Sequence, residues 1–399
     1  MTTLRAPALL LAGLLLLTAA PAVAQSPAPS PGSGSATTSG RAAPQARWKQ
    51  GKAALVRRAG ILGHAVTLGD EVIAIATGTD KHDQAVARTL ATKDGNRWRK
   101  RGQIKLVGSI NDLIADGDTL YAVGWNEGAA VWRSTDGGKT WTRPKDAAPF
   151  AGSADGGGGD DQAASAVAIA KGPAGLLIVG SVTDPVTLAR RGAAWRSADG
   201  TTWERLPGAA ALPPFRGLAA DGTTYVAVSA TSGLAMSPFG ADASRLRWST
   251  DGATWTAATV DLAGGESVDG VTALEGGGFL AWGHPYGPEV AAGSPAITWT
   301  STDGRNFTRG STDAALAGAD LAVIRSLEGG ALVMGVGGAP EGAYAFPSLG
   351  DAWRRDTIRP GGQLCVNDVA SVKAILIAVG GACGAKKATG RAWTTPLEP

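Results

Sequence analysis

The sequence predicts an all-β protein that is built from a repeated four-stranded unit, and three observations support this prediction. First, Gly accounts for 58 of the 399 residues, while the hydrophobic content of 44% is that of a folded protein. Second, a Ser/Thr-x-Asp-Gly turn followed by an aromatic residue recurs along the chain. Third, a short apolar run rich in β-branched residues precedes each of these turns, as is typical of a buried strand.

The spacing of the turns fits one four-stranded sheet per repeat. Clear copies read TKDGNRW, STDGGKTW, SADGTTW, STDGATW and STDGRNF, and they begin at residues 92, 134, 197, 249 and 301. A weaker copy, SLGDAW, covers 348–353, and Thr395 holds the Ser/Thr position of a truncated last copy. The steps between successive Ser/Thr positions are 42, 63, 52, 52, 47 and 47 residues. A period near 50 residues is typical of one β-propeller blade.

The segments around each turn predict four strands per blade. Two apolar runs joined by a tight turn come first, the third strand carries an apolar residue two places before the Ser/Thr, and the fourth begins at the aromatic residue. The predicted blades are 61–105, 108–146, 163–208, 214–261, 266–311, 319–358 and 363–399. The last blade lacks a fourth strand, which the segment 47–55 is expected to supply. This would close a seven-bladed β-propeller over residues 47–399 and remove an open edge.

The repeated turn resembles the Asp-box, or bacterial neuraminidase (BNR) repeat, S-x-D-x-G-x-x-W. The copy at 134–141 matches it fully, the copies at 197, 249 and 301 are one residue shorter, and Phe307 replaces the Trp. The resemblance covers the chain after residue 47 and implies a sialidase-like propeller within the WD40-YVTN-BNR-like repeat superfamily. In that family the motif is a structural hairpin between the third and fourth strands, so its Ser, Asp and Trp residues are expected to be structural.

The N-terminus predicts export. Arg5 precedes a 15-residue apolar run at 6–20, and Ala22-Val23-Ala24 forms a small-x-small cleavage site. Residues 1–24 are therefore predicted to be a secretory signal peptide, because the run is short for a membrane span and no stop-transfer charges follow it. A Ser-, Pro- and Gly-rich segment at 25–46 predicts a flexible linker. We expect an extracellular or periplasmic protein with no membrane span after cleavage, and a monomer.

The two cysteines are expected to form a disulfide. Cys365 and Cys383 lie symmetrically about residue 374, where the first hairpin of the last blade is predicted to turn. Export favours oxidation, so a Cys365–Cys383 bond is predicted across two antiparallel strands. The alternative is a pair of free buried thiols.

Candidate binding residues lie where the innermost strands of the blades begin. Aligning these strands by their apolar pattern places a polar side chain at the channel mouth in every blade. These residues are His64, Asp112, Ser165, Arg216, Asp269, Asp320 and Asp368. Two interpretations remain open. An Asp that recurs by blade can bond backbone amides of the neighbouring blade, or the residues can form a polar ring that binds a cation or a polyol.

Loops expected on the same face add His82 and His284 to the candidate ligand-binding residues. The long segment 145–164 carries Asp155, Asp160 and Asp161, whose oxygens could bind Ca²⁺, but they match no known calcium-loop template and a solvated flexible loop is the preferred interpretation. No other cofactor is evident, because the chain has no Walker A, G-x-S-x-G or H-E-x-x-H motif.

Charge and motif content favour a binding module over an enzyme. With 37 basic and 34 acidic residues, the chain has no strong positive field, which argues against nucleic-acid binding. The resemblance makes a sialidase-like glycoside hydrolase the alternative. However, seven blades are counted where sialidases have six, and the R-I-P motif is missing, with only Phe215-Arg216-Gly217 near it. We therefore expect an exported propeller that binds a glycan or protein ligand at its channel mouth.

Overall fold

The computed structural model describes residues 48–106, 108–151, 164–183, 189–229, 246–263, 266–285, 296–310, 316, 321–327, 330–335, 343–346, 354–356, 364–382 and 389–396. Every described residue belongs to one compact unit, Gln45–Pro399. The predicted signal peptide and linker therefore lie outside the described residues. Within the described part, no helix has the length and apolar character that a membrane crossing requires.

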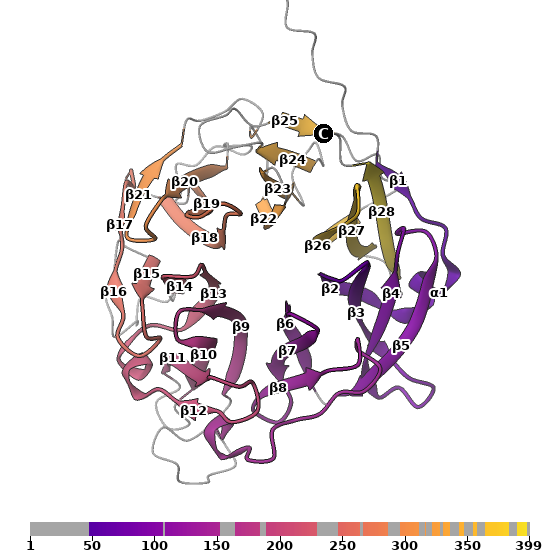
Figure 1. The fold of residues 1–399 in the computed structure, drawn as a ribbon, viewed down its shortest axis with the longest axis horizontal. Helices are drawn as coiled ribbons and strands as arrows, with labels where there is room; N and C mark the ends of the chain where they lie inside the picture. The colour runs from indigo at the N-terminus through magenta and orange to yellow at the C-terminus, as the bar shows by residue number, and fades with distance from the viewer. Residues whose placement is uncertain are drawn as a thin grey trace, which may run out of the picture. The chain divides into compact units, whose positions relative to one another are not determined.

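The described residues form seven sheets, numbered here in chain order, and most have four strands (Figure 1). Sheet 1 contains β2 (Ile61–Leu68), β3 (Glu71–Thr79), β4 (Ala85–Thr92) and β5 (Trp98–Lys105). Sheet 2 contains β6 (Ser109–Asp116), β7 (Thr119–Trp125) and β8 (Ala129–Ser134). Sheet 3 contains β9 (Ser165–Gly172), β10 (Gly175–Thr183), β11 (Arg190–Ser197) and β12 (Glu204–Arg205). Sheet 4 contains β13 (Phe215–Ala220), β14 (Tyr225–Ser229), β15 (Leu246–Ser249) and β16 (Thr256–Ala257).

The remaining sheets follow the same up-and-down order. Sheet 5 contains β18 (Glu266–Ala273), β19 (Phe279–Pro285), β20 (Ile297–Ser301) and β21 (Asn306–Arg309), to which β17 (Thr259–Val260) adds in parallel. Sheet 6 contains β22 (Leu321–Leu327), β23 (Gly330–Gly335), β24 (Ala343–Phe346) and β25 (Arg354–Asp356). Sheet 7 contains β26 (Leu364–Val372), β27 (Ile375–Ala382), β28 (Gly390–Pro396) and β1 (Lys49–Gln50). Short helices α1 (Ala54–Ala59), η1 (Ala148–Phe150) and η2 (Pro207–Ala211) complete the described elements.

The first strand of each sheet faces a common centre (Figure 1). These inner strands are β2, β6, β9, β13, β18, β22 and β26. Each contacts the next inner strand along the chain, and β26 contacts β2. This radial arrangement of antiparallel sheets is that of a β-propeller.

The N-terminal strand joins the sheet formed by the C-terminus. In β1, Lys49 lies opposite Thr394 and Gln50 opposite Trp393, and the Gly51 amide donates to the Ala392 carbonyl at 2.9 Å. The strand is shorter than the predicted segment 47–55, because helix α1 begins at residue 54 and buries Val56 and Ala59. These contacts place β1 as the outer strand of sheet 7 and leave β28 paired on both edges.

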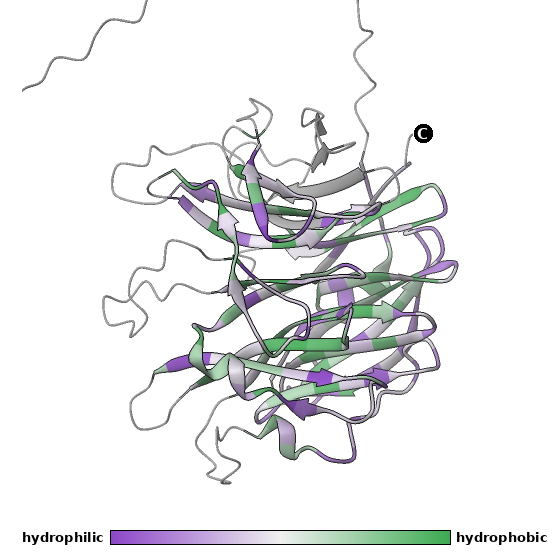
Figure 2. Cartoon of the chain, turned by 60° about the vertical axis from the view of Figure 1, so that its left-hand side comes forward, coloured by the Kyte–Doolittle hydropathy of each residue, from purple (hydrophilic) through white to green (hydrophobic). Residues whose placement is uncertain are grey.

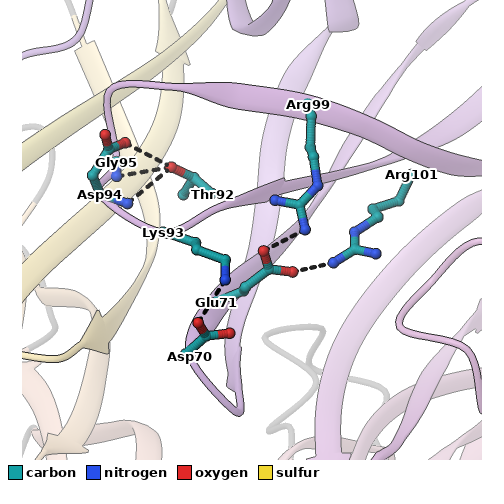
Figure 3. Close-up of polar contacts among 8 residues, drawn as sticks. All are labelled: Asp70, Glu71, Thr92, Lys93, Asp94, Gly95, Arg99 and Arg101. Carbon is teal, nitrogen blue, oxygen red and sulfur yellow. Dashed lines mark hydrogen bonds and ion pairs between the residues drawn. The ribbon is translucent and has the colours of Figure 1, made fainter.

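Five of the repeated turns share one hydrogen-bond pattern, and Figure 3 shows the contacts of Thr92 with Asp94 and Gly95 in the first of them. The Thr92 hydroxyl accepts the Gly95 amide at 2.8 Å, and Asp94 Oδ1 accepts the amides of Asn96 at 2.9 Å and Arg97 at 2.7 Å. The turn glycines are Gly95, Gly138, Gly200, Gly252 and Gly304, and their φ angles lie between 70° and 82°. A side chain would strain this backbone, so glycine is required there. The sixth predicted copy, at 348–353, lies outside the described residues.

Large side chains two residues before the turn fill the spaces between sheets. Trp195, Trp299 and Trp393 have no exposed surface, and Trp132 is only 3% exposed. Hydrophobic residues lie mainly within the strands, whereas hydrophilic residues are frequent at strand ends and turns (Figure 2). These tryptophans of the third strands therefore fix each outer hairpin to the core between the sheets.

The predicted disulfide falls on residues that the structure describes only in part. The hairpin turns at Lys373, as expected, with Val372 opposite Ile375. A register shift between Val366 and Asp368 then places Cys365 opposite Gly381. Direct pairing of the two cysteines across the strands was therefore wrong in register, because one strand contains an extra residue. Cys383 lies outside the described residues, so the disulfide itself stays a prediction.

Deleting residues 47–55 should lower the free energy of unfolding by at least about 3 kcal/mol. Trp48 is only 8% exposed, and loss of a buried Trp alone costs this much. The deletion would also expose β28 as an edge strand that is prone to aggregation. Chemical denaturation would measure the change, with deletion of the predicted linker 25–46 as a control. An unchanged midpoint after removal of 47–55 would show that β1 does not stabilise sheet 7.

The turn aspartates should make stability dependent on acid pH. Partial burial raises the pKa of Asp136, but hydrogen bonds from Thr140, Ser134 and Lys139 lower it further, from 3.8 to about 2. The amides of Thr202 and Thr201 likewise lower the pKa of Asp199. A carboxylate whose pKa is lowered by folding stabilises the native state above its unfolded pKa, and this stabilisation disappears as the pH falls through the folded pKa.

We therefore expect the melting temperature to fall between about pH 4 and pH 2. The variant Asp136→Asn should show a shallower fall, because its side chain no longer titrates. Asp118→Asn is the control, since no described residue hydrogen-bonds to its carboxylate. Identical pH profiles for Asp136→Asn and the unmodified protein would contradict this account.

Candidate functional site

Each of the seven inner strands contains a β-bulge, that is, one residue more than the stretch of the second strand with which it pairs. The pairing of inner and second strands skips one inner-strand residue in every sheet. The skipped residues are Gly63, Asn111, Val167, Arg216, Asp269, Ala322 and Asn367. Such β-bulges bend a strand and redirect the side chains at and beside the bulge. The bulge therefore provides a common reference level for comparing the sheets.

The predicted candidate residues lie at different positions along their strands, counted from this bulge. His64, Asp112 and Asp368 directly follow it, whereas Arg216 and Asp269 are the bulge residues themselves. Ser165 lies two residues before the bulge of its strand, and Asp320 lies outside the described residues. Aligning all of them as equivalent was wrong, because the apolar pattern does not reveal the extra residue. The structure brings together His64, Asp112 and Asp368 as one set.

Asp112 and Asp368 connect neighbouring sheets through backbone amides. Asp112 accepts its own Leu113 amide at 2.8 Å and the Ile169 amide of sheet 3 at 3.0 Å. Asp368, which has no exposed surface, accepts the Val369 amide at 2.8 Å and the Ala65 amide of sheet 1 at 3.0 Å. These are the contacts expected if a recurring Asp bonds the neighbouring blade. Both carboxylates therefore serve the packing of the sheets.

The residues beside these aspartates donate to the same neighbours. Asn111 Nδ2 donates to the Ala166 carbonyl at 2.7 Å, and Asn367 Nδ2 donates to the Leu62 carbonyl at 2.9 Å. His64 Nε2 lies 3.2 Å from the Ile110 carbonyl, which requires the hydrogen on Nε2. Sequence reasoning missed both asparagines, although the repeated Asn-Asp pair was a visible signal.

The other candidates face the surface. Asp269 accepts a hydrogen bond from the Ser267 hydroxyl at 3.0 Å and contacts Nδ1 of the exposed His284. Arg216 and His82 are exposed, and the His82 amide donates to Asp80 at 2.7 Å. The possible calcium ligands Asp155, Asp160 and Asp161 lie outside the described residues. Within the described ranges, no group of three or more His, Cys, Asp or Glu residues could hold a metal ion.

A central cavity of about 400 Å³ opens between the inner strands. The residues that line the cavity follow the bulge in each inner strand. The cavity therefore lies further along these strands than the channel mouth at which the sequence placed the candidate residues. Among the described residues of the predicted set, Asp112 alone lines it. Most of the wall consists of small or apolar side chains, among them Ala115, Ala170, Ala219 and Ala370. A small ligand, or one end of a larger one, could enter this space.

Arg325 is the functional candidate that sequence reasoning missed. It lies in β22, lines the cavity, and binds Asp368 through Nε at 2.9 Å and Nη2 at 3.1 Å. The carboxylate of Asp368 raises the pKa of Arg325, burial opposes this, and Asp112 adds to it. No described residue hydrogen-bonds to Nη1, so this edge of the guanidinium is available to the cavity. The only sequence signal was a single charge within an apolar inner strand.

A second charged cluster in sheet 1 is structural. Glu71 at the start of β3 is only 6% exposed, and Arg99 and Arg101 of β5 both contact its carboxylate (Figure 3). Burial raises the pKa of Glu71, but the two guanidinium groups lower it further, so the carboxylate stays ionised. These charges satisfy one another and fix the outer strand of the sheet to its first hairpin.

The contacts of the three aspartates predict how much stability each Asp→Ala variant loses. Asp368→Ala should be the most destabilising, because it leaves two amides and Arg325 without their acceptor, and each unsatisfied amide costs about 1–3 kcal/mol. Asp112→Ala should cost less, since among the described residues Ile169 is its one hydrogen-bond partner in another sheet. Asp269→Ala should cost less than about 1 kcal/mol, because exposed ion pairs contribute little. Denaturant unfolding measures all three, and an equal loss for the three variants would contradict the inter-sheet role.

Comparisons with known proteins identify the fold. No protein-family model and no curated protein matches this chain. Solved structures do match, and one is YCF48 from Cyanidioschyzon merolae, with a TM-score of 0.57 and 16% identity over 88% of this chain and 100% of that chain. A structure of YCF48 bound to D1 peptide has a TM-score of 0.55 and 14% identity over 90% and 97% of the two chains.

A third match is an acylaminoacyl peptidase from Pyrococcus horikoshii. Its TM-score is 0.51 at 12% identity, and the match covers 86% of this chain and 53% of that one. Identities this low carry the fold and no more. Together with the radial sheets, these similarities show that the chain has a β-propeller fold.

Proposed function

We propose that this chain is an exported interaction module, a seven-bladed propeller closed by its N-terminal strand, which binds a carboxylate of a protein or glycan ligand in the central cavity. The observation that carries the proposal is the available Nη1 edge of Arg325 in a cavity lined by small side chains. Export rests on the signal peptide predicted at residues 1–24.

The contacts of the sheets support the closed seven-bladed ring. Seven inner strands contact one another in succession, and the last contacts the first. Pairing of β1 with β28 joins the two ends of the unit in one sheet. A ring closed in this way has no open end at which another sheet could add.

The chemistry of the cavity favours an anionic group on the ligand. Arginine binds carboxylates through paired N–H groups, and such bonds are strongest away from water. Asp368 occupies one edge of Arg325 and holds it rigid, so the second edge is positioned before a ligand arrives. Lys171, which also lines the cavity, is bonded to Asp116 at 2.6 Å. Arg325 is therefore the cation that we assign to ligand binding.

The carboxylates of the inner strands favour binding over hydrolysis. A glycoside hydrolase needs two opposed carboxyl groups about 5–10 Å apart, one of them with a raised pKa. Asp112 and Asp368 accept backbone amides between the sheets, and Asp269 contacts His284. None of these three is free to act as a nucleophile or a general acid. The peptide in the YCF48 complex adds support for a protein ligand, because it shows that a structurally similar propeller binds one.

Blocking the cavity should abolish binding while the fold is retained. Ala220→Trp would fill much of the cavity, whereas Arg325→Lys would keep the charge and remove the planar fork. The probes are arrays of uronic-acid oligosaccharides and of peptides with free C-termini, with neutral oligosaccharides and amidated peptides beside them. Ala257→Trp on the exposed strand β16 is the control and should bind as the unmodified protein does. Unchanged binding by Ala220→Trp would contradict the cavity as the site.

A further inference from the structure

The wall of the central cavity carries charges of both signs. Its charged residues are Arg325 of β22, Lys171 of β9 and Asp112 of β6. Lys171 is bonded to Asp116 at 2.6 Å, and Arg325 is bonded to Asp368. The bonds of Asp112 to described residues come from backbone amides, and no described cation forms an ion pair with it. Its carboxylate is therefore the one charge of the described wall that lacks an ion-pair partner.

Asp112 can accept more hydrogen bonds than it receives. An ionised carboxylate has about four acceptor positions on its two oxygens. The Leu113 amide bonds to Oδ1 and the Ile169 amide to Oδ2, so the described residues fill one position on each oxygen. Asp112 is half-buried and lines the cavity, whereas Asp368 has no exposed surface. A donor that enters the cavity therefore finds its acceptor at Asp112 rather than at Asp368.

Asp112 and Arg325 reach the cavity from different walls. Inner strands β26 and β2 lie between β22 and β6 in the succession of contacts around the cavity. The two charges nevertheless act on each other, because Asp368 raises the pKa of Arg325, burial opposes this, and Asp112 adds to the rise. A carboxylate bound at Arg325 would thus meet the negative charge of Asp112. Like charges repel most strongly away from water, so a ligand that also carries a cation suits this cavity better.

The turns at the outer end of the cavity add negative charge. The turns between first and second strands directly follow the residues that line the cavity, so they border its end. Asp118, Asp221 and Glu275 lie in three of these turns and make no ion pair within the described ranges. Lys373 is the one described lysine or arginine in these turns. A rim with more unpaired carboxylates than cations attracts cationic groups.

We infer that the occupant of the central cavity is the C-terminus of a peptide that ends in lysine or arginine. Its carboxylate binds Arg325, and its cationic side chain binds Asp112. The inference rests on the proposed function, in which Arg325 receives a carboxylate, and it decides between the two kinds of ligand left open there. Uronic acids carry a carboxylate without a cation, whereas a C-terminal lysine or arginine carries both groups on one residue. A cavity of about 400 Å³ has room for such an end of a chain rather than for a long segment.

The probes are N-acetylated peptides of the sequence Gly-Ser-Gly-Ser-Lys, titrated by isothermal calorimetry. Acetylation of the N-terminus leaves the lysine side chain as the only cation. One matched peptide ends in Nε-acetyl-lysine and keeps the carboxylate without the cation. The other ends in lysine amide and keeps the cation without the carboxylate. We expect the lysine peptide to bind and both matched peptides to bind at least about tenfold more weakly.

The outcomes separate this inference from the proposed function. Equal binding of the acetyl-lysine peptide would overturn the inference alone, because the carboxylate would still be recognised. Equal binding of the lysine amide would contradict both, since Arg325 would then not select a carboxylate. Binding of uronic-acid oligosaccharides but of no peptide would overturn the inference and leave the proposed function. Absence of binding by either class would overturn both.

The variant Asp112→Asn tests the contact with the cation. It removes the charge and keeps a side-chain oxygen that can accept a backbone amide. Binding of the lysine peptide should weaken at least about tenfold, while binding of the acetyl-lysine peptide stays as it is. A purely structural role of Asp112 would instead weaken both peptides alike, and that result would overturn the contact. If the variant does not fold, the comparison of the three peptides on the unmodified protein still decides the inference.

Glu127→Gln is the matched control. It makes the same change of charge at an exposed residue of the same sheet, in the loop between β7 and β8. Both peptides should bind it as they bind the unmodified protein. An equal loss of lysine-peptide binding in Glu127→Gln and Asp112→Asn would indicate a general charge effect and would overturn Asp112 as the partner of the lysine.

Discussion

The bulge in each inner strand, together with the polar bonds that the Asn-Asp bulges of sheets 2 and 7 make to the next sheet, is the constraint on which the rest of this propeller depends. Neighbouring sheets of a propeller pack through side chains and share few backbone bonds, so something must fix how they meet. Asn367 and Asp368 do so by bonding a carbonyl and an amide of sheet 1, and Asn111 and Asp112 repeat this toward sheet 3. Because the partners are backbone groups, the next sheet is held whatever its side chains are.

The sequence revealed the turns well and the site poorly, for one physical reason. The hydrogen bonds that Ser134 and Asp136 make within the turn 134–141 join residues at most four positions apart, so the required Ser, Asp and Gly are visible in a single sequence. The bulge requires only one extra residue, and Gly63, Val167 and Ala322 have nothing in common that would mark it. The predicted ring therefore mixed residues from three levels, although the strands that carry them were predicted correctly.

Sheet 2, in which the structure describes three strands, shows how one residue changes a repeated structure. The repeat needs a backbone donor three places after the turn's aromatic residue, and Leu206, Ala258 and Gly310 supply it without using their side chains. Proline is the one residue type that cannot. Pro144 was visible in the sequence, but its importance follows only once the equivalent bonds of the other sheets are known. The fourth strand of this sheet was therefore predicted where the chain cannot form it.

The exceptions to the repeat are where function is expected. At the position of Arg325, the other six inner strands carry small or apolar residues or a threonine, namely Val66, Ile114, Ala170, Ala219, Thr272 and Ala370. The fold therefore needs no charge there. An ion pair with a buried partner rarely stabilises a protein more than well-packed apolar residues do, and here the carboxylate of Asp368 is fully out of water while the Arg325 side chain is 36% exposed. The Arg325–Asp368 pair thus has no advantage for folding over an apolar residue, and its position in the cavity wall gives it one for binding.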